Sequence, residues 1–130
     1  MHPVIRFRTT LFDVSREPEN PINPIRGVSV LEWLRKRVPS ELAMSSPEPE
    51  DWGWFSSVDW RGRLYMVGAC ANESADGSHE WLLQFEKSRS FKERLLGQGK
   101  FASDDPCLAY FQALVTQEPA FAEVSTELGP

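Results

Sequence analysis

Four segments of the chain have the pattern of β-strands: apolar and polar residues alternate with a period of two in three of them, and the fourth, 63–71, is largely apolar. The segments span residues 4–14, 53–60, 63–71 and 80–89. Arg61 and Gly62 separate the second segment from the third, and glycine at this place supplies the positive φ of a tight hairpin turn. Segment 63–71 is apolar on both faces, so we expect a central strand that is covered at least partly on both sides.

Three other segments have apolar residues at helical spacing. Each begins with a helix start signal: Ser29 with Glu32, Ser90 with Glu93, and Asp105 followed by Pro106. Pro39, Gly97 and Pro119 are expected to end the three helices, because proline cannot continue a helix and glycine adopts the left-handed C-terminal conformation. The sequence therefore predicts the element order β-α-β-β-β-α-α.

This order predicts an α+β fold with one four-stranded, mostly antiparallel sheet and helices packed on one face. We expect residues 1–130 to form a single domain, since a chain of this length buries about two thirds of its surface. Residues 119–130 are polar and acidic, and they are expected to form a weakly ordered or lightly docked tail. A helix follows the first strand, so the pattern leaves the pairing partner and direction of that strand open.

The chain is acidic, with 14 Lys and Arg against 19 Asp and Glu, which gives a net charge of −5. A nucleic-acid partner is therefore unlikely, because binding to phosphates requires a basic surface. No apolar run approaches the roughly 20 residues that span a bilayer, and the first six residues lack a signal-peptide pattern. We expect a cytoplasmic protein without a membrane partner.

The two cysteines, Cys70 and Cys107, fit a reducing compartment and a structural role in the core. Cys107 lies in the first turn of a predicted helix, where a thiolate can be activated, but nearby aspartates oppose this. Residues 97–100 resemble a phosphate-binding loop only faintly, because Arg94 and Phe101 replace the glycine and hydroxyl positions of that motif. No metal or cofactor motif is found, so we expect neither a metal site nor a cofactor.

The segment 47–54 combines prolines, carboxylates and tryptophans. Trp52 and Trp54 offer the large rigid surface that is common at binding hot spots. The carboxylates of Glu48, Glu50 and Asp51 suit a basic partner by charge complementarity. The sequence therefore favours a binding or interaction module, rather than an enzyme, that presents this segment to a protein with a basic or mixed-charge surface. The alternative is that the tryptophans, Trp54 above all, belong to the core.

A second hypothesis is a small hydrolase or small-ligand-binding domain with a pocket near His79. This imidazole lies close to Asp76 and Glu80, which could orient it as a general base. The alternative is a solvated histidine in a turn. A third hypothesis is a homodimer that buries an exposed apolar face.

Basic residues form two clusters along the chain. One is the run 35–37, and the other consists of Lys87, Arg89, Lys92 and Arg94. Together with the acidic segment, these clusters suggest a protein with two faces of opposite charge. The alternative is an ordinary surface of mixed charge.

Overall fold

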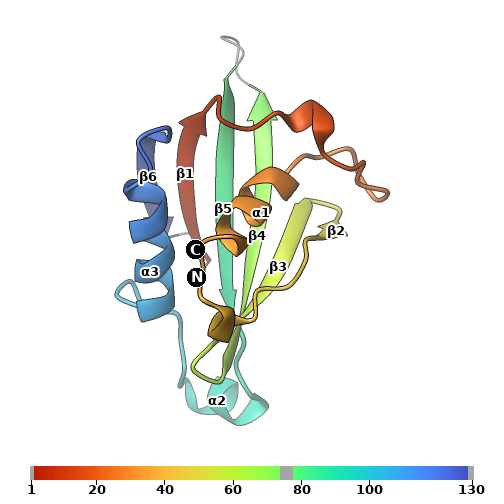
Figure 1. Cartoon of the computed structure of the whole chain (residues 1–130). Coiled ribbons are helices and arrows are strands. Elements are labelled where there is room, and N and C mark those ends of the chain that lie inside the picture. The colour runs from red at the N-terminus through yellow and green to blue at the C-terminus, as the bar shows by residue number, and fades with distance from the viewer. Residues whose placement is uncertain (1, 74–77, 129–130) are drawn as a thin grey trace.

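The computed structural model describes residues 2–73 and 78–128. Over these residues the chain forms one antiparallel sheet of six strands in the order β2-β3-β4-β5-β1-β6, together with three α-helices (Figure 1). The strands are β1 (Pro3–Thr9), β2 (Glu48–Glu50), β3 (Gly53–Trp60), β4 (Arg63–Glu73), β5 (His79–Lys87) and β6 (Ala122–Leu128). The α+β class and the antiparallel sheet are confirmed, but the prediction of four strands is wrong.

The two additional strands lie at the edges of the sheet. β6 pairs with β1 and lies in the segment where the sequence predicted a weakly ordered tail. Most of its residues are exposed, and the register of its pairing with β1 shifts between Arg6 and Arg8. β2 is only three residues long and contains Pro49, so its sequence resembles a turn, and pairing with β3 makes it a strand.

β1 lies between β5 and β6 and is antiparallel to both, which answers the question that the sequence left open. Ile5 is opposite Leu83 and Phe7 is opposite Trp81, so their side chains enter the same side of the sheet. The predicted strand 4–14 was too long: β1 ends at Thr9, and a short 3₁₀ turn, η1 (Val14–Arg16), follows.

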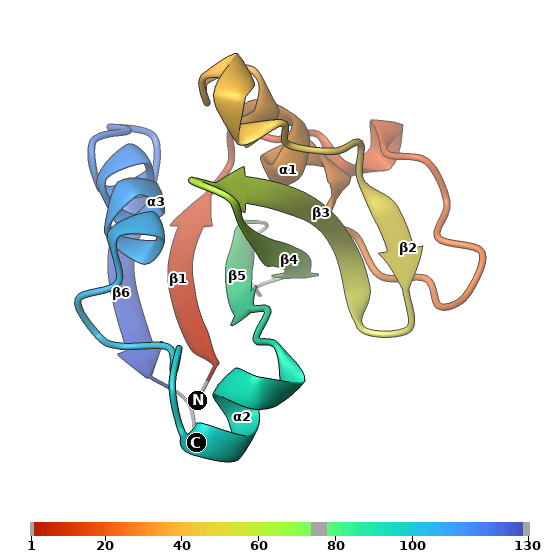
Figure 2. The same ribbon diagram turned by 90° about the horizontal axis from the view of Figure 1, so that it is seen from below.

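The helices are α1 (Val28–Arg35), α2 (Phe91–Leu96) and α3 (Pro106–Thr116), with a second 3₁₀ turn, η2 (Ser40–Leu42). α1 and α3 lie on one side of the sheet, whereas α2 lies at its end, on the opposite side (Figure 2). The core fills the space between the sheet and α1 and α3, and its largest fully buried side chains include Trp81, Phe7, Phe85, Phe111 and Leu31. None of the helices in the described part of the chain is long and apolar enough to cross a membrane.

The predicted helix caps are confirmed for two helices and wrong for the third. Ser90 and Glu93 form the reciprocal capping box of α2, and Asp105 caps α3. α1 does not use a box of Ser29 and Glu32. It begins after Gly27, and the carboxylate of Glu17, from the loop after η1, accepts hydrogen bonds from its first backbone amides.

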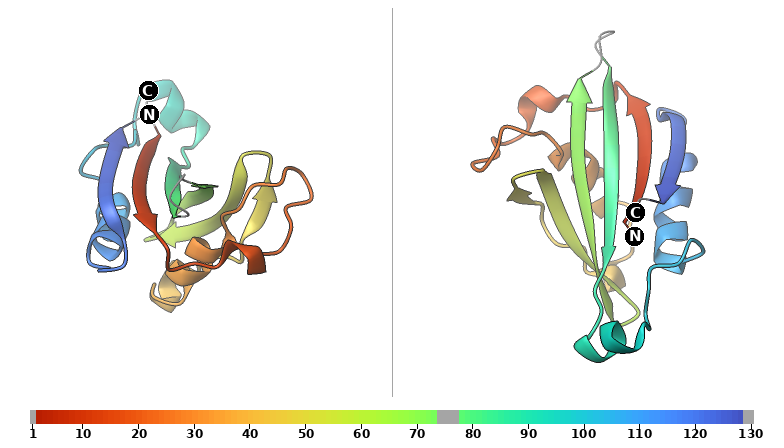
Figure 3. Two further views of the ribbon diagram at one scale, coloured as in Figure 1. Left: turned by 90° about the horizontal axis from the view of Figure 1, so that it is seen from above. Right: turned by 180° about the vertical axis from the view of Figure 1, so that it is seen from behind.

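The face of the sheet turned away from α1 and α3 is called the open face here. Strands β4, β5 and β1 run across it without a helix in front of them (Figure 3, right). Its side chains alternate with those of the core and include Val4, Phe55, Leu64, Met66 and Leu82. An antiparallel sheet usually presents polar residues on its solvated face. Here apolar side chains lie beside polar ones such as Arg6, Glu80 and Gln84.

Candidate functional site

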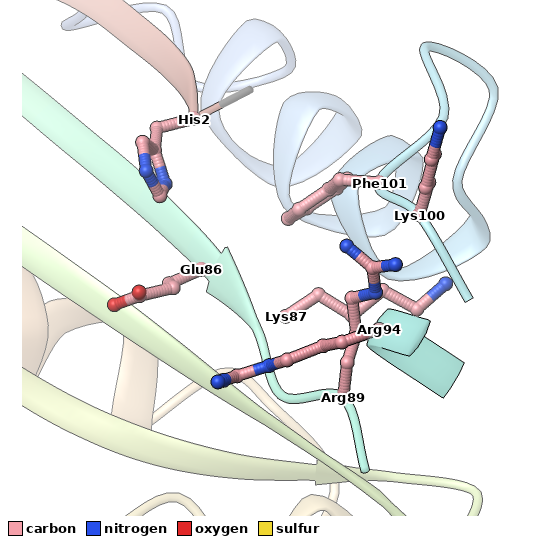
Figure 4. Close-up of a pocket in the computed structure, with 7 residues that line it drawn as sticks. All are labelled: His2, Glu86, Lys87, Arg89, Arg94, Lys100 and Phe101. Carbon is pink, nitrogen blue, oxygen red and sulfur yellow. The ribbon is translucent and has the colours of Figure 1, made fainter. Parts of the chain in front are cut away.

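A pocket of about 520 Å³ lies where β5 ends, beside α2 and the segment that leads to α3. Its volume falls within the range of about 300–1,000 Å³ that is usual for small-molecule sites. Figure 4 shows the side chains that surround it, which come from the start of β1, the end of β5, α2 and the loop before α3. They are His2, Glu86, Lys87, Arg89, Arg94, Lys100 and Phe101.

The lining of this pocket is strongly cationic. It contains four Lys or Arg side chains and one carboxylate, Glu86, within a chain whose net charge is −5. Among the described residues, no side chain forms a hydrogen bond or an ion pair with the side chain of Arg94 or of Lys100. Both side chains therefore keep their full hydrogen-bonding capacity for a ligand. Figure 4 shows that the guanidinium of Arg94 extends toward Glu86, whereas the ammonium of Lys100 points in another direction. A concave surface lined by cations still concentrates a positive field within an acidic protein.

Glu93 holds the outer wall of the pocket together. Its carboxylate accepts two hydrogen bonds from Arg63, at 3.1 and 2.8 Å, and a third from the backbone amide of Ser90. Gly99 packs so closely against this carboxylate that a Cβ atom would overlap it, and its φ of 68° also favours glycine. The guanidinium of Arg89 donates to the carbonyl oxygens of Glu93 and Gln98, at 3.3 and 2.9 Å. These contacts tie α2, β4 and the 97–100 loop into one wall.

The hydrogen bonds from Arg63 are the main reason why the pKa of Glu93 is lowered to about 2, and the Ser90 amide adds to the effect. A carboxyl group with a lowered pKa stabilises the fold above its unfolded value of about 4.3, and loses this contribution as the pH falls through the folded value. The Glu93 carboxylate is therefore charged throughout the neutral range.

The inner wall is built around Asp105, which is 3% exposed. Its carboxylate accepts hydrogen bonds from the Tyr65 hydroxyl at 2.8 Å and from the Lys87 ammonium at 3.3 Å. It also caps α3 through the amides of Cys107 and Leu108. Burial, followed by the hydrogen bond to Asp105, raises the pKa of Tyr65, so its hydroxyl remains a donor. Lys87 is thus held in place by a buried partner while it lines the pocket.

The cysteines lie away from the lining of this pocket. Burial, with a further contribution from Asp105, raises the pKa of Cys107 to about 12, and burial also raises the pKa of Cys70. Both thiols are therefore protonated at neutral pH, as expected for structural cysteines.

No protein-family model matches the chain, and no curated protein or solved structure matches it either. The function must therefore be argued from the chemistry of the surface itself. On this basis the cationic pocket is the strongest candidate site, because it combines a concave shape, several cationic lining residues and a wall fixed by hydrogen bonds.

The acidic segment that the sequence favoured forms the β2–β3 hairpin. Glu48 and Asp51 are exposed, and Glu50 is partly buried. Trp52 lies across Gly68 on the open face, so closely that a Cβ atom at Gly68 would overlap the indole ring. Trp54 is only 5% exposed and donates its indole N–H to the carbonyl of Ile25 at 3.0 Å. Trp54 is therefore a core residue, which was the stated alternative.

The turn of this hairpin is fixed to the proline-rich loop 17–25. The Asn20 amide donates to the carbonyl oxygens of Glu50 and Gly53, at 2.9 and 2.8 Å, and the Asn23 amide donates to that of Asp51 at 2.8 Å. The hairpin thus presents its carboxylates from a rigid base. In Figure 1 β2 lies at the right-hand side of the molecule and α2 at its lower end, so the two regions do not coincide.

Of the set predicted around His79, the structure describes His79 and Glu80. His79 begins β5 and lines none of the five main pockets found over residues 2–73 and 78–128. Glu80 lies on the open face and pairs with Arg6 at 3.5 Å and Arg8 at 3.9 Å. Asp76 lies outside the described residues.

The cationic pocket itself was missed as a site. The cluster of Lys87, Arg89 and Arg94 was visible in the sequence, but it was interpreted as one face of a surface with mixed charge. Lys100 was considered only as part of a phosphate-loop motif, and that motif fails. The run 35–37 lies elsewhere, with Arg35 paired to Glu32 and Arg37 stacked over Trp33.

Proposed function

We propose that this protein is a binding module for a small organic anion, with a phosphate or carboxylate group held in the pocket between β5, α2 and the 97–101 segment. The observation that carries the proposal is the cationic lining of a concave site in an otherwise acidic protein. Of its four cationic side chains, Lys87 is paired with Asp105, and those of Arg94 and Lys100 have no ion-pair partner among the described residues. A surface of scattered charges would not place them around a common volume.

The chemistry of the lining supports an anion with an organic part. The guanidinium groups of Arg89 and Arg94 can donate pairs of hydrogen bonds to a phosphate or carboxylate, and Lys100 adds a compact charge. Phe101, which is 8% exposed, contributes an apolar surface to the same pocket. A ligand with both an anionic group and an apolar group would therefore satisfy the lining better than an inorganic ion.

The first prediction concerns the two unpaired cations. We expect Arg94→Gln and Lys100→Gln each to weaken the binding of pyrophosphate about tenfold at low ionic strength, which corresponds to about 1.4 kcal/mol. Binding is measured by NMR titration of the backbone amides of residues 86–101. Lys92→Gln is the matched control, because it removes the same charge from α2 at a position that does not line the pocket. Equal weakening by Lys92→Gln, or no binding to the unmodified protein, would contradict the proposal.

A second candidate function is protein binding through the acidic hairpin. The observation that favours it is the rigid attachment of the hairpin by Asn20 and Asn23, in a stretch, 41–60, that has no Lys or Arg. The combined variant Trp52→Ala, Glu48→Gln, Glu50→Gln, Asp51→Asn is expected to lose a basic protein partner in affinity capture read by mass spectrometry. A control removes three other exposed carboxylates, with Glu41→Gln, Glu73→Gln and Asp104→Asn. Retention of every partner by the hairpin variant would exclude this function.

A further inference from the structure

We infer that the anion bound in the pocket carries an apolar chain, and that this chain lies along the open face of the sheet between Leu64 and Trp52. The inference rests on the proposed function and specifies its ligand as a single-chain amphiphile with a phosphate or carboxylate head. The term apolar strip is used here for Phe55, Leu64 and Met66, with Trp52 as its far boundary.

The first support is the continuity of two pockets. A second pocket of about 260 Å³ adjoins the cationic one and shares Glu86, Lys87 and Arg94 with it. The remaining lining of this second pocket comes mainly from the apolar strip and its neighbours, and includes Phe55, Ser57, Leu64 and Met66. A ligand with its charged group beside Arg94 can therefore extend directly into an apolar groove.

The second support is the exposure of the strip. Leu64 is 55% exposed and Met66 follows it two residues later on the same face of β4. α1 and α3 cover only the other face, and α2 lies beyond the end of the strands (Figure 2). The strip is therefore accessible to a ligand on the open face.

The geometry of β4 and β3 gives the strip a direction and an end. Leu64 lies near the pocket, whereas Gly68, which is opposite Phe55, lies four residues farther along, a span of about 14 Å for an antiparallel strand. Gly68 has no side chain, and the Trp52 ring occupies the space above it. The strip therefore begins at a cluster of cations and ends at an indole ring.

The charge at one end favours an amphiphile over a second copy of the chain. A second copy would have to bring an apolar surface to the strip and carboxylates to Arg94 and Lys100 at the same time, because cations taken out of water need a counter-charge. An amphipathic anion satisfies both regions at once, because its head neutralises the cations while its chain covers the apolar side chains.

The experiment compares ethyl, hexyl and decyl phosphate, each below its micelle concentration, by isothermal titration calorimetry with the full chain. The affinity is expected to rise about two- to fourfold for each added methylene, fourfold being the value for complete burial, and to level off once the chain reaches Trp52. Ethyl phosphate tests the proposed function alone, because its chain is too short to follow the strip.

Variants separate the head from the chain. Leu64→Ser is expected to reduce the advantage of decyl phosphate over ethyl phosphate at least fivefold and to leave the affinity for ethyl phosphate unchanged. Because Leu64 is already largely exposed, this variant should fold. Ile22→Ser, at an exposed apolar position outside the strip, is the matched control and should change neither affinity. Arg94→Gln should weaken all three ligands by the same factor.

The possible results distinguish the two proposals. If ethyl phosphate binds and decyl phosphate binds no more tightly, the inference is overturned and the proposed function stands. If no alkyl phosphate binds, both are overturned. Sedimentation with vesicles of phosphatidylglycerol and phosphatidylcholine tests the other source of the same chemistry. Binding to vesicles without binding of monomeric decyl phosphate would overturn the inference. The inference would also be overturned if analytical ultracentrifugation showed that self-association of the protein accounts for the effect of chain length.

Discussion

Asp105→Ala is expected to lower the free energy of unfolding by about 3–4 kcal/mol, the largest effect that we predict for a single side chain. The carboxylate is almost completely buried and joins three parts of the fold: the α3 N-terminus, the Tyr65 hydroxyl on β4 and the Lys87 ammonium on β5. Removing it leaves a buried hydroxyl and a largely buried ammonium without their acceptor, and it also removes the helix cap.

Urea denaturation followed by circular dichroism measures this effect. Tyr65→Phe is the matched control, because it removes one of the donors and leaves the carboxylate with Lys87 and the two amides, so a smaller loss of about 1 kcal/mol is expected. Asp105→Asn should lie between the two, since an amide can still cap the helix but cannot neutralise Lys87. A loss below 1 kcal/mol for Asp105→Ala would show that the buried network does not hold these elements together.

The sequence predicts the central part of the fold well because the physical signals there are local. The alternation in 53–60, the apolar segment 63–71 and the Arg61-Gly62 turn together predict the β3–β4 hairpin. Both turn residues have positive φ. The edges were harder. β6 does alternate, with Val124 and Leu128 between polar neighbours, but its charge and its terminal position suggested a tail. Glu48-Pro49-Glu50 has no strand propensity at all, and only its pairing with β3 defines β2.

The candidate site was less predictable because it depends on contacts between distant segments. Local charge identified Lys87, Arg89 and Arg94, but only the fold brings His2 to the same pocket and places α2 beside the open face. The position of Trp52 follows from the register that sets Phe55 opposite Gly68, and a register cannot be read from composition. The acidic residues of the hairpin are neighbours in the sequence, whereas the cations of the pocket come from separate segments.

The capping of α1 is a further case in which a contact between distant segments could not be predicted from the local sequence. Ser29 and Glu32 have the spacing of a capping box, yet Glu32 pairs with Arg35 at 3.1 Å, and the cap comes from a residue outside the helix. The loop 17–25 places the Glu17 carboxylate at the helix N-terminus, where it accepts the hydrogen bonds that a local capping box would otherwise accept. This loop also carries Asn20, which holds the β2–β3 hairpin, so one segment fixes two neighbouring elements.

Glu17→Ala is therefore expected to lower the free energy of unfolding by about 2–3 kcal/mol. Glu17 is 9% exposed, and its two carboxylate oxygens accept hydrogen bonds from the amides of Gly27, Val28 and Ser29 at 2.8, 3.1 and 2.8 Å. The alanine variant leaves these donors unsatisfied at the positive end of the α1 dipole.

Two further variants test whether Glu17 acts as a cap rather than as a general surface charge. Glu17→Gln keeps one acceptor oxygen but loses the charge, so about half of the effect is expected. Glu19→Ala removes an exposed carboxylate from the same loop and should change stability by less than about 0.5 kcal/mol. Thermal denaturation of the four proteins gives the comparison. If Glu17→Ala were no less stable than Glu19→Ala, the loop would not cap α1, and the helix N-terminus would have to be stabilised by solvent alone.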